Sequence, residues 1–447
     1  VGLTACSDFF EPIPGVQFGL DETFASKQRT EEYLNNVYSY VREVTDAIHP
    51  NTYGGIFTEA SLDGANRWNK TYAEWTNGSF NSASAQASEY FSKYYQAIAK
   101  ASTFIQNVDK CTEAAASTRG KWKSEARALR AYYYFELLRL YGPIPLIGED
   151  PIPLDASLEE LIKERNSVDE CVNFIATELQ SAIDSGDLLQ RAGKANLGRM
   201  DVATCMALKA KLYLYWASPL FNGNTDQASV KNKDGKQLFP QTEDHSKWTQ
   251  ARDAYERFMT FATGQGYKLT EVYTNGKLDP YASCRAAGEF FTTTWEAVDE
   301  LIFVKLRDLY DYTYWVCPKF TDFQDTDVTG GGGYYTTQET VDLFFTKDGL
   351  TIEEDPGYDK FEGVPGANNF TSGRYYDPNN PSRLYFDADK SKVLKQWKDR
   401  EPRFYVNITY SGSIWLNEGK YNEEMRTDFT NGANGTCGKS KASGDCP

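Results

Sequence analysis

A short polar stretch in the first fifth of the chain carries side chains that could bind a hydroxyl-rich ligand. A sugar presents apolar C–H faces, which stack on flat rings, and a rim of hydroxyls, which need hydrogen-bond donors and acceptors. One loop supplies an indole, a carboxylate, an amide and a guanidinium, and a second indole follows. The candidates are Asp63, Asn66, Arg67, Trp68 and Trp75. The structural alternative is that Trp68 caps a helical core and that Asp63 and Arg67 form a weak surface ion pair.

Two further candidate groups lie in the second half of the chain. Tyr314 and Trp315 end an aromatic run; if this run is extended, the two side chains point to opposite faces. Arg374, Tyr375 and Tyr376 lie within residues 355–382, where Asp, Pro, Gly and Asn predict a long loop. The alternatives are a buried strand for the first group and a loop packed by its own rings for the second.

Residues for the common catalytic and metal sites are scarce. There are two histidines, His49 and His245, far apart in the chain, and no CxxC motif. The acidic run 322–327 resembles half of a calcium loop, but Thr336 stands where the loop needs Glu. We expect a solvated acidic loop and no cofactor, with calcium as the alternative. Because no pair of carboxylates stands out among 63 acidic residues, we expect a binding protein and not an enzyme.

Composition excludes other classes. The chain has 447 residues with 47 Lys and Arg against 63 Asp and Glu, a formal charge of −16. That balance argues against nucleic acid as a partner. Mean hydropathy is −0.58, and the sequence has no apolar run of the length that a transmembrane helix needs. Aromatic residues make up 15%, which suits the faces of sugars or peptides.

Four apolar stripes at helical spacing predict amphipathic helices in the first half. Gly142-Pro143 ends the third and Pro219 follows the fourth. Successive helices of this kind bury a continuous core in helical-repeat arrays. The stripes are Leu34, Val37, Val41 and Val44; Phe91, Tyr94, Ile98, Ala101, Ile105 and Val108; Ala126, Leu129, Tyr133, Leu137 and Leu140; and Cys205, Leu208, Leu212 and Tyr215.

The composition of the sequence changes near residue 266, where Gly, Asp, Asn and Tyr become more frequent and apolar stripes at helical spacing become rare. Residues 297–306 are typical of a strand, and Gly330–Gly333 is a flexible run. We therefore expect a mostly α protein with three parts. These are a tether over 1–25, a helical scaffold over 26–265 and a loop-rich, partly β binding region over 266–447.

The first residues of the chain resemble a targeting signal, although a small apolar tetrad could also precede a buried cysteine. Leu3-Thr4-Ala5-Cys6 resembles a bacterial lipobox, which is cleaved before the cysteine. We expect Cys6 to carry lipid and to anchor the protein on a membrane surface.

One helix carries a specific family pattern. Residues 121–147 read KWKSEARALRAYYYFELLRLYGPIPLI, and residues 31–38, 198–214 and 399–405 agree, with Glu401 where Asp is usual. The chain resembles the SusD/RagB family of outer-membrane lipoproteins, which bind nutrients, mostly glycans, for a TonB-dependent transporter. Family members place ligand aromatics in the interhelical region, which here contains residues 63–75. The family's C-terminal helices have no match, so we expect the sequence to be incomplete there.

The resemblance implies a tetratricopeptide-like helical scaffold with a loop-rich ligand face. It also implies an extracellular lid on a SusC-like transporter, lipid-anchored in the outer membrane, that hands oligosaccharide inward. Two alternatives stay open. One is RagB-like uptake of oligopeptides, where the negative charge favours basic peptides. The other is a helical glycoside hydrolase.

Overall fold

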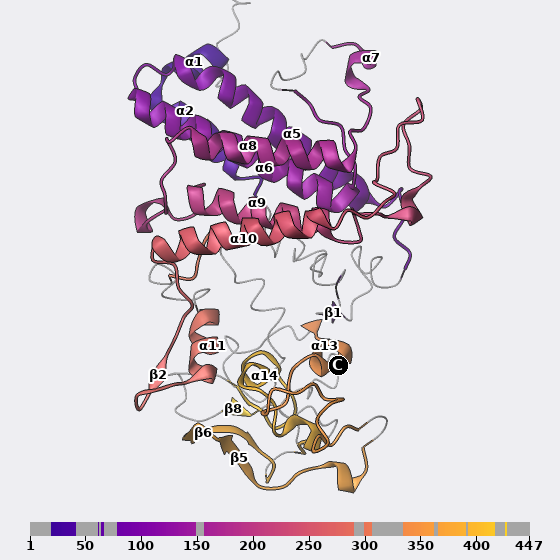
Figure 1. The fold of residues 1–447 in the computed structure, drawn as a ribbon. Helices are drawn as coiled ribbons and strands as arrows, with labels where there is room; N and C mark the ends of the chain where they lie inside the picture. The colour runs from indigo at the N-terminus through magenta and orange to yellow at the C-terminus, as the bar shows by residue number, and fades with distance from the viewer. Residues whose placement is uncertain are drawn as a thin grey trace, which may run out of the picture. The chain divides into compact units, whose positions relative to one another are not determined.

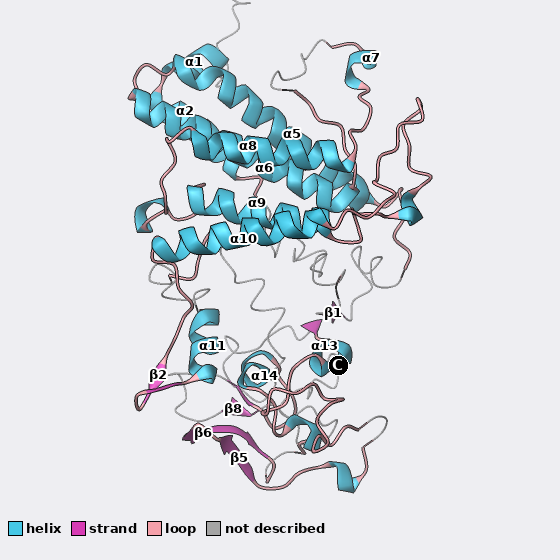
Figure 2. Cartoon of the chain, viewed as in Figure 1, coloured by secondary structure: helices cyan, strands magenta, loops and turns pink. Residues whose placement is uncertain are grey.

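The computed structural model describes residues 19–41, 61, 64–66, 78–148, 156–289, 299–305, 334–361, 365–389, 392–415 and 425–426. They fall into two compact units. The described residues of the first unit are 19–41, 83–148, 156–267 and 302–305, and the second unit holds the others. Helices dominate (Figures 1 and 2), and the described strands pair only in two-stranded sheets. The expected mostly α class with a partly β second region is confirmed.

The first unit is a stack of helices. Each long helix from α5 to α10 packs against the next long helix in the chain (Figure 1). Helix α2 also contacts α5 and α6, and α1 packs against α2. Gly142 ends α6 at φ +69°, where its amide donates to the Leu138 carbonyl at 3.0 Å. The helices are α1 (Leu20–Ala25), α2 (Lys27–Tyr38), α5 (Ala85–Asn107), α6 (Ala116–Tyr141), α7 (Leu158–Leu161), α8 (Val168–Asp184), α9 (Val202–Ala217) and α10 (Ser246–Gly264), with 3₁₀ turns η2 (Val108–Lys110), η3 (Lys194–Asn196) and η4 (Thr225–Gln227).

Helix α6 differs from the prediction of an amphipathic helix. It is buried on nearly every side from Trp122 to Leu138, because α2, α5, α8 and α9 all contact it. Three of its charged residues, Glu125, Arg130 and Glu136, are therefore buried as well. The Arg130 guanidinium donates to both Glu178 on α8 and the Ser102 hydroxyl on α5. Glu125 accepts from the Tyr38 hydroxyl at 2.8 Å and from Arg199 at 3.1 Å.

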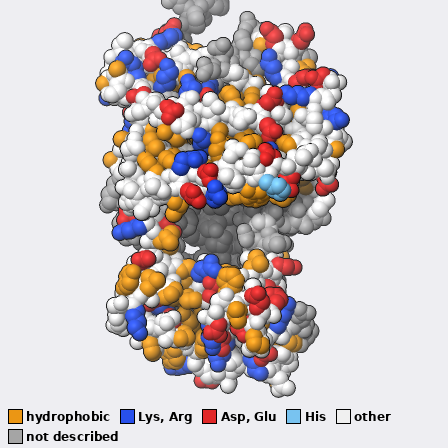
Figure 3. Space-filling model, in the orientation of Figure 1, with side chains coloured by type: hydrophobic (Ala, Val, Ile, Leu, Met, Phe, Trp, Pro, Cys, Tyr) orange, Lys and Arg blue, Asp and Glu red, His pale blue; other side chains and the backbone are white. Residues whose placement is uncertain are grey.

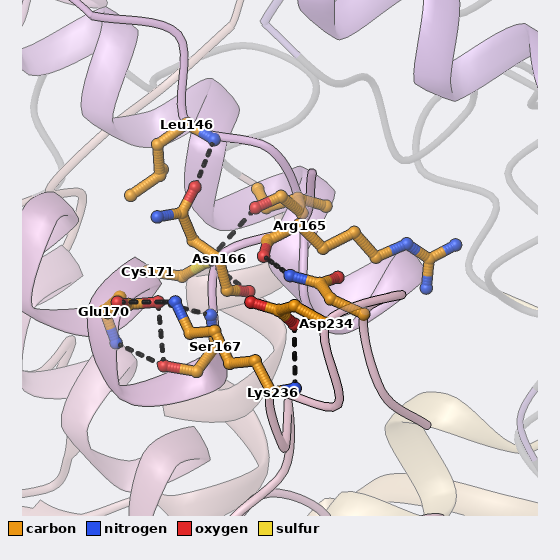
Figure 4. A network of polar contacts seen from close by, with 10 residues as sticks. Leu146, Arg165, Asn166, Ser167, Glu170, Cys171, Asp234 and Lys236 are labelled. Atoms are coloured by element: carbon orange, nitrogen blue, oxygen red, sulfur yellow. Dashed lines mark hydrogen bonds and ion pairs between the residues drawn. The ribbon is translucent and has the colours of Figure 1, made fainter. Parts of the chain in front are cut away.

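A polar network at the start of α8 fixes two loops (Figure 4). Ser167 and Glu170 form a capping box, in which the Glu170 carboxylate accepts from the Ser167 amide at 2.7 Å. Lys236 donates to both oxygens of that carboxylate, at 2.8 and 2.7 Å. The Asn166 side chain accepts from the Leu146 amide at 3.0 Å. The loops around residues 146 and 236 are thereby tied to one helix end.

The second unit is built from short elements around an aromatic core. Helix α11 packs against α14. The core residues are Tyr281, Val341, Tyr385, Phe386, Val393, Phe404 and Tyr410. The elements are β1 (Ala65–Asn66), β2 (Tyr273–Thr274), β3 (Lys277–Leu278), α11 (Pro280–Glu289), β4 (Tyr334–Tyr335), α13 (Gln338–Asp342), η7 (Ala367–Asn369), β5 (Arg374–Asp377), β6 (Asn380–Asp387), η8 (Lys395–Trp397), α14 (Pro402–Asn407), β7 (Ile414–Trp415) and β8 (Met425–Arg426).

Three local expectations change. The described residues 299–305 form turns and no strand, because Ile302 and Phe303 pack against helices of the first unit instead of pairing with a strand. The expected loop 355–382 contains η7, β5 and the start of β6. Residues 1–25, expected as a tether, include α1, whose Phe24 is fully buried.

Candidate functional site

Most of the predicted binding residues lie outside the part of the chain that the structure describes, and their roles stay predictions. These are Asp63, Arg67, Trp68, Trp75, Tyr314 and Trp315, together with the expected lipidation site Cys6 and the acidic run 322–327. Asn66, Arg374, Tyr375 and Tyr376 lie in described strands.

The first candidate loop contributes a strand to the second unit. Asn66 in β1 pairs with Tyr334 in β4, and Ala65 pairs with Tyr335. This pairing places β1 next to Tyr335, which is 42% exposed. Sequence reasoning missed Tyr335, although its position two residues after the Gly330–Gly333 run could have marked it as an accessible ring.

The β5–β6 hairpin separates the three residues of the last candidate group. Side chains alternate along β5, so Arg374 and Tyr376 are exposed while Tyr375 is partly buried. Tyr375 packs against Tyr385, Phe386 and Tyr405, with ring centroids at 6.0, 5.2 and 6.2 Å. Its hydroxyl donates to the Asp399 carboxylate at 2.8 Å, and burial raises the pKa of Tyr375 well above its usual value.

Arg374 and Tyr376 share the outer face of the hairpin. The Arg374 Nε donates to the buried Asp387 carboxylate at 3.2 Å. A hydrogen bond to the Tyr376 hydroxyl and the charge of Asp387 raise the pKa of Arg374 above its ordinary value. The Tyr376 ring is 39% exposed. The face thus offers a flat ring beside a fixed guanidinium, which can stack on an apolar ligand face and donate to its oxygens.

The segment 399–401 holds this hairpin against its neighbours. Asp399 adopts φ +57°, and its carboxylate accepts from Tyr375 and from Lys347, the latter at 3.1 Å. The buried Arg400 guanidinium donates to the Tyr358 hydroxyl at 2.7 Å and to the backbone carbonyls of Val341 in α13 and Phe344 just after it. Tyr375 in β5 is therefore held by Asp399, which lies beyond β6 in the sequence.

Other site types find no support within the described ranges. There, no three His, Cys, Asp or Glu side chains are placed to hold a metal ion. None of the described helices has the length and apolar character to cross a membrane. A groove of about 760 Å³ lies on the first unit and contains none of the predicted residues. Its lining is Met206, Asp253, Glu256, Arg257, Thr260 and Phe261.

Comparison with known families accounts for the helical scaffold and much of the second unit. Residues 17–214 match a SusD-like family model described as "Starch-binding associating with outer membrane", and residues 300–444 match the SusD family model. The chain belongs to the SusD/RagB family. The signature of α6 and the segment 399–405 are its SusD-type features, and the structure gives both a structural role.

Relatives agree with the SusD assignment. A "SusD-like protein" of Bacteroides ovatus is 27% identical over 175 residues, which cover 38% of this chain and 30% of that protein. The solved protein BT4246 shares 24% identity with a TM-score of 0.72, covering 90% of this chain and 68% of that one. A SusD-like protein of Bacteroides fragilis shares 21% with a TM-score of 0.64, covering 92% and 67%. The solved structures confirm the SusD-like, tetratricopeptide-like helical fold.

Proposed function

We propose that this SusD-like chain is a surface glycan-binding lipoprotein that captures oligosaccharide and delivers it to a SusC-like TonB-dependent transporter, acting as the transporter's lid. The observation that carries the proposal is the match of residues 17–214 to a family described as starch-binding at the outer membrane. A solved relative from Bacteroides fragilis, titled a SusD-like carbohydrate binding protein, has the same fold at 17% identity and a TM-score of 0.57. In this role Cys6 would carry the lipid anchor, with the protein facing the extracellular side.

The proposed binding chemistry is stacking plus hydrogen bonding, without any covalent step. Tyr376 supplies an exposed ring, and the Arg374 guanidinium beside it can donate to sugar oxygens. Trp68 and Trp315, which lie outside the described residues, are the proposed indole contacts. A binding protein that releases its ligand to a transporter needs only moderate affinity, and a few stacked rings supply that range.

Calorimetric titration with a panel of neutral oligosaccharides tests the proposal. We expect at least one glycan to bind, and Tyr376→Ala to weaken that binding about three- to tenfold, because one ring contact contributes about 0.5–1.5 kcal/mol. The matched control is Trp248→Ala on α10, whose ring is 41% exposed, close to the 39% of Tyr376. The control should bind like the unchanged protein.

Each contrary result points to an alternative. Binding of basic oligopeptides with no response to any glycan would replace the glycan by a peptide ligand, which the charge of −16 would attract. Release of shorter sugars on long incubation would indicate a glycoside hydrolase. The transporter role predicts that a large outer-membrane protein co-purifies with the lipidated chain, and purification of the lipidated chain alone would contradict it.

A further inference from the structure

The β2–β3 hairpin exposes an apolar face outside the site described above. Tyr273 is 60% exposed, the largest exposed fraction of any large aromatic side chain among the described residues, and Leu278 is 48% exposed. The two residues are direct cross-strand partners. Partners in an antiparallel pair point to the same face, so the ring and the leucine lie side by side. Figure 1 shows the hairpin as an arm beside α11.

A tight turn closes this arm. Asn275 and Gly276 adopt φ values of 53° and 76°, both in the left-handed region. Two such residues between paired strands form the type I′ turn that Asn-Gly favours, and its twist matches that of the strands. Tyr273 therefore lies on a paired strand closed by a two-residue turn, and not in an open loop.

The base of the arm is anchored by a buried carboxylate. The Asp279 amide donates to the Val272 carbonyl at 2.8 Å, and its side chain accepts from the Thr274 hydroxyl at 2.8 Å. Both terminal nitrogens of Arg383 donate to the same carboxylate at 2.9 Å. The Arg383 guanidinium also lies over the Tyr281 ring at 4.3 Å, which joins the hairpin to the aromatic core.

The ring orientation is also set. The Tyr273 hydroxyl donates to the Glu271 carboxylate at 2.9 Å. A phenol oxygen and a carboxylate are both acceptors for sugar hydroxyls. The face therefore combines one flat ring of fixed orientation, one aliphatic neighbour and acceptors at its edge.

We propose that the β2–β3 hairpin is a second carbohydrate-contacting site, in which Tyr273 stacks on one sugar ring and Glu271 accepts from its hydroxyls. This inference rests on the proposed glycan-binding function. The size of the exposed face formed by Tyr273 and Leu278 favours a sugar over a protein as the occupant. A stable protein interface needs about 800 Å² on each partner, whereas one tyrosine with one leucine offers an area of the order of a single sugar ring.

The test uses the full chain and two ligand lengths. Binding of a neutral polysaccharide and of the best-binding short oligosaccharide is measured for the unchanged protein, Tyr273→Ala, Tyr273→Phe and the control Leu269→Ala, an exposed neighbour before the hairpin. We expect Tyr273→Ala to weaken polysaccharide binding about three- to tenfold, and Tyr273→Phe to keep most of it because the ring remains. Leu269→Ala should have no effect.

A direct readout locates the contact. Amide hydrogen exchange over residues 270–279 should slow when the polysaccharide is added, and the slowing should be absent in Tyr273→Ala. Equal polysaccharide affinity of Tyr273→Ala and the unchanged protein would overturn the second site while leaving the proposed function intact. Failure of the unchanged protein to bind any glycan would instead overturn the proposed function.

Discussion

At the scale of single residues, the buried charges of the helical unit are the most sensitive positions. Arg130 is fully buried and donates to Glu178 and Ser102. Replacement by Met removes hydrogen bonds that satisfy a buried carboxylate, and the expected loss of unfolding free energy is about 3–5 kcal/mol. Denaturant titration followed by circular dichroism measures it. The control Arg252→Met, at an exposed ion pair with Asp253, should change stability by less than about 1 kcal/mol.

Asp279 makes the free energy of unfolding depend on pH in the acidic range. The hydrogen bond from Arg383 lowers the pKa of Asp279 from 3.8 to about 2. A carboxyl whose pKa is lower in the folded state stabilises fully above its unfolded pKa, and the gain disappears as pH falls from about 4 to 2. The shift corresponds to about 2 kcal/mol. Asp279→Asn should therefore be less stable than the unchanged protein at neutral pH, with the gap closing near pH 2. A gap that stays constant with pH would contradict this.

The residue types of the last candidate group indicated its binding chemistry, but they did not indicate which of its side chains are exposed. Arg374, Tyr375 and Tyr376 were equivalent in sequence, yet alternation along β5 exposes the first and third and packs the second against other rings. The pairing that decides this alternation forms with β6, and its register shifts twice along the hairpin. Such irregular register leaves no sequence signal.

At the scale of elements, the start of α8 offers a measurable capping effect. The Ser167 hydroxyl accepts from the Glu170 amide, and the Glu170 carboxylate accepts from the Ser167 amide. Ser167→Ala should lower the free energy of unfolding by about 1 kcal/mol. Thermal unfolding measures the change, and Ser157→Ala before the four-residue α7 is the control. An equal effect at both sites would contradict a specific role for the α8 cap.

Helical periodicity predicted α5, α6 and α9, but it did not predict which helix is central. The stripe in α6 is real, yet the remaining faces are covered by further helices that arrive from distant parts of the chain. The prediction of a strand that includes residues 299–305 was wrong for a related reason. Their apolar side chains satisfy a strand pattern and a packed irregular segment equally well, and only the available partner decides.

At the scale of the whole molecule, the negative charge separates the two ligand classes. Acidic and basic side chains are mixed over the face in Figure 3, while the sum over the chain is −16. Stacking on a neutral glycan involves no net charge, so its affinity should change less than about twofold between about 50 and about 500 mM salt. A steep loss of affinity with salt, measured by the same titration, would favour a basic peptide ligand.

The segment Ile302–Lys305 belongs to the helical unit, although the residues before and after it belong to the other. Its Lys305 ammonium donates to the Val41 carbonyl at 2.7 Å and to Ser39 at 3.2 Å, just past the end of α2. The Ile302 carbonyl accepts from the Thr204 hydroxyl on α9 at 3.4 Å. During synthesis the scaffold therefore cannot complete these contacts until the ribosome has delivered residue 305. An expression fragment truncated at residue 267 would contain the described helices of this unit and still lack this last piece, so a recombinant scaffold should have residues 302–305 spliced back onto it.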